Sequence, residues 1–208
     1  MYHGERFNSI SHLVGAALSV AGLGALLTVS IQTRDPATIF SFTLFGISLV
    51  LLYTMSTLYH SFSHDRLKSV FRKLDHVTIY LLIAGTYTPY LTVSLADRTG
   101  YVMLAIIWAL ALLGVLIDVL SPRRLVPLQV GIYLFMGWIC IFRFSAFASV
   151  IPEPGLLLLT LGGLTYTGGV VFYLLDKTRR VPHAHGIWHL FVLAGSIAHF
   201  ASVIGYVR

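Results

Sequence analysis

The chain has 208 residues, of which 57% are hydrophobic and only 11% are charged, and its mean hydropathy is +0.83. That composition excludes a water-soluble globular domain, because there are too few polar residues to coat a core of this size. The formal net charge of +6 does not indicate nucleic-acid binding, because the basic residues cluster in short loops between apolar runs, as they do in polytopic membrane proteins.

Seven apolar runs, each of roughly 20 residues, are long enough to cross a bilayer as helices. They predict a single all-α transmembrane domain over residues 1–208, with spans near 11–31, 37–62, 74–95, 100–120, 126–145, 155–175 and 184–206. The first run is longer than the apolar region of a signal peptide, and no small-residue cleavage site follows it, so it is predicted to be a span. Cys140 is the single cysteine, which excludes an intramolecular disulfide.

Glycine and proline punctuate this pattern. Turn-forming residues separate the runs at Asp35-Pro36, Arg98-Thr99-Gly100, Ser121-Pro122 and Pro152-Glu153-Pro154-Gly155. Pro89 predicts a kink in the third span that opens room beside Asp75. The pairs Gly162-Gly163 and Gly168-Gly169 predict that the sixth span packs closely against a neighbouring helix.

The orientation of the chain follows from its Lys and Arg residues. The N-terminal arm and the second, fourth and sixth loops hold ten of them: Arg6, Arg66, Lys68, Arg72, Lys73, Arg123, Arg124, Lys177, Arg179 and Arg180. The opposite side holds four: Arg34, Arg98, Arg143 and Arg208. The positive-inside rule therefore predicts a seven-helix bundle with the N-terminus inside and the C-terminus outside.

Ionisable residues at membrane depth are costly, and they gather at the predicted inner ends of three spans. The second span ends with Ser56-x-x-x-His60, the third starts with Asp75, and the seventh starts with His185-x-x-x-His189. A spacing of four residues stacks two side chains on one helix face, about 6 Å apart along the axis. That is the geometry of half a metal site, which a third imidazole from another helix would complete, leaving the fourth position to water as in catalytic zinc sites.

Histidines and aspartates near helix ends also have interpretations that involve no metal. Histidines near helix ends commonly face lipid headgroups, and this is the interpretation for His3, His64, His76 and His183. Asp75 could pair with Arg72 or cap a helix N-terminus. Convergence of three helices at one depth favours the metal.

In order along the chain, these residues resemble the hemolysin III family of bacterial membrane proteins, related to the progestin and adipoQ receptors that include the adiponectin receptors. The resemblance covers essentially the whole chain. Its motifs are Glu5-x-x-Asn8-x-x-Ser11-His12, Ser56-x-x-x-His60, Asp75, His185-x-x-x-His189 and the His199 of Ala198-His199-Phe200.

The resemblance implies a seven-helix bundle in the bacterial inner (plasma) membrane, with a Zn²⁺ ion held by His60, His185 and His189 near the cytoplasmic face. It places Asp75 against the zinc-bound water and Ser56 beside it. Zn²⁺ lowers the pKa of such a water to about 7. Asp75 would accept its proton and pass it to a leaving amine. The Ser56 hydroxyl would stabilise the oxyanion of a tetrahedral intermediate.

The leading hypothesis is therefore zinc-dependent hydrolysis of a lipid amide or ester, serving membrane lipid and energy homeostasis. A site inside the bilayer is reached by membrane lipids, and the wider superfamily includes alkaline ceramidases. Two alternatives are a pore-forming cytolysin or channel, as the family name suggests, and a non-catalytic, metal-stabilised regulator of membrane state. No span carries the continuous charged stripe expected of a wide aqueous channel.

Four further polar residues surround the predicted site. His199 shares a helix face with His185 but lies too far along the helix from His189 to bind the same ion, so it predicts a polar-lined cavity toward the membrane centre. Glu5, Asn8 and His12 either cover the mouth of the site or cap the first helix.

Overall fold

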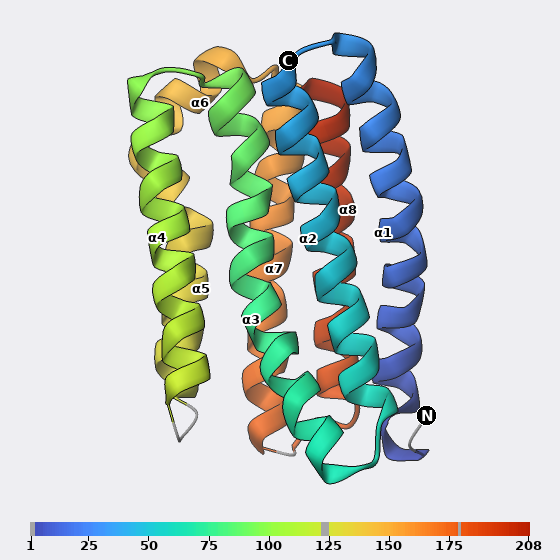
Figure 1. The fold of residues 1–208 in the computed structure, drawn as a ribbon. Coiled ribbons are helices and arrows are strands. Elements are labelled where there is room, and N and C mark those ends of the chain that lie inside the picture. The colour runs from blue at the N-terminus through green and yellow to red at the C-terminus, as the bar shows by residue number, and fades with distance from the viewer. Residues whose placement is uncertain (1–2, 122–124, 179) are drawn as a thin grey trace.

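The computed structural model describes residues 3–121, 125–178 and 180–208, and these residues form a bundle of long helices with no β-strand (Figure 1). The helices are α1 (Arg6–Thr33), α2 (Pro36–Ser61), α3 (Asp65–Pro89), α4 (Arg98–Leu120), α5 (Val126–Trp138), α6 (Phe144–Val150), α7 (Glu153–Thr178) and α8 (Ala184–Tyr206). A 3-10 turn, η1 (His3–Glu5), precedes α1, a π-helical turn, η2 (Tyr90–Ser94), continues α3, and a 3-10 segment, η3 (Ile139–Arg143), joins α5 to α6. Pro122, Arg123, Arg124 and Arg179, on which the turn and orientation predictions partly rest, lie outside the described residues.

The helices begin where the turn-forming residues predict. Asp35 caps α2 by accepting a hydrogen bond of 2.8 Å from the backbone N–H of Thr38, and Pro36 is the first helical residue. Asp97 caps α4 in the same way, through a bond of 2.7 Å from the N–H of Gly100. A Cβ at Gly100 would lie 1.8 Å from the carbonyl oxygen of Leu95, so this helix start requires glycine.

Six segments of the described chain are helical, long and apolar enough to cross a membrane: α1, α2, α4, residues 126–150, α7 and α8. Large apolar side chains cover their outward faces; Phe40, Leu120 and Phe142 are 62%, 74% and 74% exposed. Exposed apolar surface of this extent suits lipid rather than water. The chain is therefore an all-helical, multi-pass membrane protein.

The helix α3 runs the length of the bundle with the other long helices, and the two chain termini lie at opposite ends of the bundle (Figure 1). Unlike the six segments above, α3 is not apolar enough along its whole length to count as a span, because its first half carries many charged residues. The helix begins at Asp65, nine residues before the predicted span, so Asp75 lies ten residues inside the helix and does not cap it. Pro89 lies fourteen residues beyond Asp75, about 21 Å along the axis. The prediction that Pro89 opens room beside Asp75 is therefore wrong.

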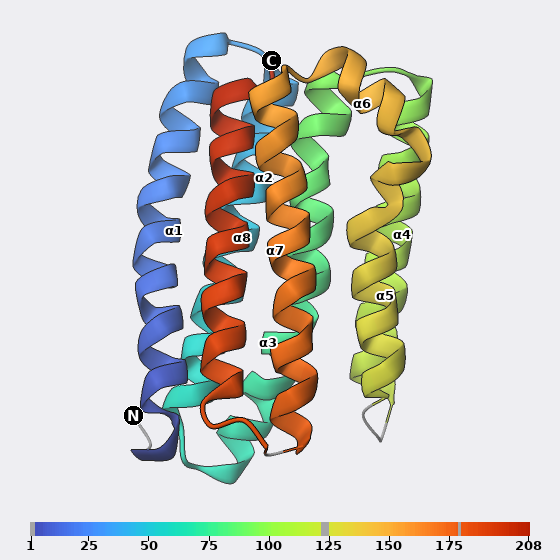
Figure 2. The same ribbon diagram turned by 180° about the vertical axis from the view of Figure 1, so that it is seen from behind.

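Two sets of closely packed helices form the core. One consists of α1, α2 and α3, and the other of α7 and α8, with α1 and α8 joining them (Figure 2). The predicted close packing of the sixth span is confirmed. A Cβ at Gly162 would lie 2.7 Å from Nε2 of His199, and one at Gly169 would lie 2.7 Å from Cβ of Phe191. By contrast, α5 packs only sparsely against α7.

Candidate metal centre

Three histidines converge at the end of the bundle that holds the N-terminus. His60 is in the last turn of α2, and His185 and His189 are in the first two turns of α8. Their candidate ligand atoms all lie within 4.8 Å of one another, so the group could hold a metal ion. His60 and His189 are buried, at 2% and 1% exposure, which keeps competing water away from their rings.

The ends of the two helices bring these rings together. The helix α2 stops directly after Ser61, where the backbone N–H of Phe62 donates to the carbonyl oxygen of Leu58. The helix α8 starts after His183, which adopts a left-handed conformation with φ of 58°. The four-residue spacing then places His185 and His189 on the same face of α8, opposite His60.

Each of the three rings has its Nδ1 held by an oxygen atom. Nδ1–H of His60 donates to Oε2 of Glu5 at 2.7 Å, and that of His189 donates to the carbonyl oxygen of Asn8 at 3.0 Å. Nδ1 of His185 lies 3.3 Å from Oδ2 of Asp176. This leaves Nε2 of each ring for a metal. Nε2 of His60 is buried and has no hydrogen-bond partner within the described chain. Metal-binding histidines commonly show this arrangement, in which the second nitrogen fixes the tautomer and the ring orientation.

Glu5 is the most strongly held of these anchoring groups. Besides His60 it accepts a hydrogen bond of 2.8 Å from the amide of Asn8, and Nζ of Lys68 lies 3.5 Å from its other oxygen. Burial raises the pKa of the Glu5 carboxyl, but the hydrogen bonds from His60 and Asn8 and the nearby charge of Lys68 outweigh it and lower the pKa to about 2. Glu5 and Asn8 therefore contact the histidine group through Nδ1 of His60 and of His189, and Glu5 makes no side-chain capping bond to α1.

The structure brings Asp75 and Ser56 to the lining of the cavity that His185 and His189 also line. Oγ of Ser56 is buried and has no hydrogen-bond partner within the described residues. Asp75 forms no ion pair with Arg72, so that alternative is not supported among the described residues. Asp75 does not belong to the group of mutually close ligand atoms.

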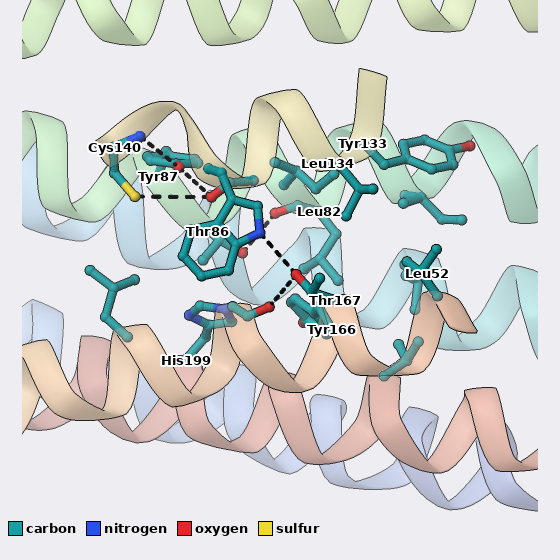
Figure 3. A pocket seen from close by; sticks show the side chains of 18 of the residues that line it. Leu52, Leu82, Thr86, Tyr87, Tyr133, Leu134, Cys140, Tyr166, Thr167 and His199 are labelled. Atoms are coloured by element: carbon teal, nitrogen blue, oxygen red, sulfur yellow. Dashed lines mark hydrogen bonds between the residues drawn. The ribbon is translucent and has the colours of Figure 1, made fainter. Parts of the chain in front are cut away.

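The cavity has a volume of about 210 Å³ and extends from the histidine group along the bundle to His199. Figure 3 shows part of its lining: His199, Tyr166 and Thr167 lie on the side of α7 and α8, and Tyr87 and Leu134 lie on the other side. His76 lines the cavity too, and its interpretation as a residue facing lipid headgroups is wrong. His64 and His183 are exposed.

Sequence reasoning missed one contributor to the site and did not predict the contact that a second one makes. Asp176, near the end of α7, anchors His185. It lies next to other charged residues before a loop, and nothing in the sequence distinguishes it from an ordinary exposed charge. His12 stacks on His189 with ring centroids 3.6 Å apart, and both of its ring nitrogens are buried without a hydrogen-bond partner in the described chain. The motif Glu5-x-x-Asn8-x-x-Ser11-His12 was a usable signal for His12, because it places three polar side chains at the buried end of α1.

The fold and the histidine group together define a multi-pass membrane protein with a three-histidine group that could hold a metal in its core. Comparison with known proteins agrees with that class. The chain belongs to the hemolysin III family, because the family profile described as "Haemolysin-III related" matches residues 1–200.

Two bacterial relatives cover nearly the whole chain. It is 40% identical over 203 residues to Hemolysin-3 of Bacillus cereus, covering 98% of this chain and 91% of that protein. It is 40% identical over 202 residues to the Hemolysin-3 homolog of Bacillus subtilis (strain 168), covering 97% and 93%. A more distant relative is the monocyte to macrophage differentiation factor of Homo sapiens, 31% identical over 169 residues, which are 79% of this chain and 69% of that protein. The family named by the sequence resemblance is thus confirmed.

Proposed function

We propose that this protein is a zinc-dependent hydrolase of a membrane lipid amide or ester, and that it adjusts the lipid composition of the membrane in which it lies. The observation that carries the proposal is the group of three histidines with anchored Nδ1 atoms, two of which, His185 and His189, line the same cavity as Asp75 and Ser56.

The proposal includes seven crossings with the N-terminus in the cytoplasm. Counting α3 and η2 as a crossing gives an odd number, which agrees with chain termini at opposite ends of the bundle. Most of the Lys and Arg residues belong to the N-terminal arm and to the loops predicted on its side of the membrane. The positive-inside rule therefore makes that side cytoplasmic. The histidine group then lies within the inner half of the membrane.

The side chains present fit a zinc ion. Neutral imidazoles suit Zn²⁺, and three protein ligands with a fourth position left open are typical of catalytic rather than structural zinc. His60, His185 and His189 would hold the ion. A zinc ion there would supply Lewis acidity and lower the pKa of a water to about 7.

The chain's own residues would then perform the proton transfers and charge stabilisation. Asp75 accepts a proton from the attacking water and later donates it to the departing amine or alcohol. Ser56, whose hydroxyl has no other hydrogen-bond partner among the described residues, donates to the developing oxyanion. Glu5 and Asp176 hold the imidazoles in the orientation that this chemistry needs.

A lipid substrate is supported by the shape and lining of the cavity. Its walls above the histidine group are mostly apolar, with Leu52, Ile79, Ile83, Val170 and Val192 among the lining residues. The sparse packing of α5 against α7 favours entry from within the bilayer. A water-soluble substrate would gain little from such a surface, whereas an acyl chain would be desolvated by it.

A non-catalytic role of the metal is the second candidate, and one observation favours it. The histidines and their anchoring oxygens come from α2, α8, α7, η1 and the first turn of α1, so a bound ion would fix five segments. Such a scaffold would need the histidines but not Asp75.

The test is hydrolysis by purified protein of a ceramide, measured as release of fatty acid by mass spectrometry. Zinc-loaded protein should release fatty acid, chelation should stop the release, and added zinc should restore it. Absence of hydrolysis from zinc-loaded protein on ceramide, long-chain amides and long-chain esters would refute the hydrolase and leave the scaffold.

A further inference from the structure

His199 lies at the end of the cavity remote from the histidine group. It is 6% exposed and lines the cavity from α8. Its Nδ1 is buried and has no hydrogen-bond partner among the described residues. Figure 3 shows the ring pointing from the side of α7 and α8 into the cavity. The hydrogen-bonding capacity of this nitrogen is unfilled, which is costly for a buried polar group.

The neighbours of His199 fix the ring without satisfying it. Gly162 leaves room for the ring, since a Cβ there would lie 2.7 Å from Nε2. The ring of Tyr166 lies against it, with centroids 5.2 Å apart, but the Tyr166 hydroxyl is hydrogen-bonded to Oγ of Ser196 at 2.7 Å. Ser196 in turn accepts a bond of 2.7 Å from Tyr53. The polar groups behind the ring are thus bonded to one another.

Two threonines of the cavity lining have acceptor capacity to spare. The hydroxyl of Thr86 donates to the carbonyl oxygen of Leu82 at 2.7 Å, and that of Thr160 donates to the carbonyl oxygen of Leu156 at 2.9 Å. Each hydroxyl has used its only proton, so it can only accept a further bond. Together with His199, which in its neutral form has one donor and one acceptor nitrogen, this lining suits a ligand group that both donates and accepts. An alcohol is such a group.

The separation between the two polar ends of the cavity sets the position of that alcohol. His199 is ten residues beyond His189 in α8, or about 15 Å along the helix axis. An extended chain advances about 1.2 Å per bond, since the three backbone bonds of an extended residue cover about 3.5 Å. About a dozen bonds therefore separate a group at the histidines from a group at His199. The lining between them includes the apolar Ile83, Val170 and Val192.

We propose that the cavity selects lipid chains that carry a hydroxyl group about twelve carbons from the head that reaches the histidine group, and that His199 binds this hydroxyl. The inference rests on the proposed function in taking the cavity as the site of a lipid chain. It adds to the proposed function the kind of lipid chain that the cavity binds best.

The experiment compares three fatty acids as ligands of the purified, zinc-loaded protein: octadecanoic acid, the same acid hydroxylated on its twelfth carbon, and the same acid hydroxylated on its second carbon. Dissociation constants are measured for wild type, for His199→Phe and for His64→Phe. Phenylalanine keeps a ring against Tyr166 and Gly162 but forms no hydrogen bond. His64 is exposed at the start of α3, so His64→Phe is the matched control. Zinc content and melting temperature of each preparation establish that it is folded.

Wild type and His64→Phe should bind the acid hydroxylated on the twelfth carbon roughly three- to tenfold more tightly than octadecanoic acid, the ratio that one net hydrogen bond supports. The acid hydroxylated on the second carbon should show no such gain. His199→Phe should bind octadecanoic acid as wild type does and lose the preference. Equal binding of the three acids by wild type, or a preference that persists in His199→Phe, would overturn the inference and leave the proposed function intact. If no acid binds at all, the cavity is not a lipid site and both proposals fail.

Discussion

Removal of the Glu5 carboxylate should weaken zinc binding without touching a ligand. Glu5 accepts the Nδ1–H of His60 at 2.7 Å and is 24% exposed, so little solvent screens the bond. Loss of such an anchoring group typically costs 10–100-fold in metal affinity, or about 1.4–2.8 kcal/mol. We expect Glu5→Ala to lie in the upper part of that range. Asp176→Ala should lie in the lower part, because Asp176 is 3.3 Å from Nδ1 of His185 and is 35% exposed.

The assay is competition for zinc between purified protein and a chromophoric chelator of known affinity. Glu153→Ala is the matched control, because Glu153 is an exposed glutamate in the first turn of α7, at the other end of the bundle. It should bind zinc as wild type does. Unchanged affinity in Glu5→Ala, measured beside a His60→Ala variant that has lost the metal, would refute the reasoning that this carboxylate orients His60.

Three further outcomes are expected. His189→Ala should lose most of the zinc that co-purifies with wild type. Chelation should lower the melting temperature of wild type, because a ligand of the folded state stabilises it by mass action. Unchanged zinc in every single-histidine variant would contradict the ligand set. A reporter fused after Arg208 that is active only outside the cytoplasm should be active, and a C-terminal reporter active in the cytoplasm would contradict the orientation. Gly162→Ala should destabilise the protein by about 1–3 kcal/mol through contact with His199. Gly131→Ala, where nothing lies within 4 Å, should be neutral or slightly stabilising, and equal melting temperatures for the two would contradict the packing argument.

Much of the architecture could be predicted from composition and periodicity. Runs of about 20 apolar residues can hardly be anything but membrane helices, and the Asp35-Pro36 turn and the glycine pairs of α7 gave correct local structure. Helix boundaries could not be predicted where a helix extends beyond its apolar run. The first half of α3 is helical although its side chains Leu67, Val70 and Leu74 are 43%, 50% and 38% exposed, and a hydropathy pattern does not mark a charged helical turn of this kind as part of a span.

The convergence of His60, His185 and His189 was predictable because each lies at a helix end and the crossing directions alternate. The contacts around them were not. Asp176 lies near His185 although one ends α7 and the other begins α8, and no residue pattern specifies the left-handed conformation of His183 that precedes α8. The stacking of His12 on His189 depends on how α1 and α8 pack, which is a property of the assembled bundle.

The central claim is that the histidine group and Asp75 form a catalytic site rather than a metal-stabilised scaffold. The most direct test measures fatty-acid release from ceramide and bound zinc on the same preparation of Asp75→Asn. Asparagine keeps the size of the side chain but cannot accept a proton from the attacking water. Because Asp75 is not among the mutually close ligand atoms, the metal should be retained. The account predicts a folded protein with near wild-type zinc and no turnover. Wild-type turnover by zinc-loaded Asp75→Asn would contradict it.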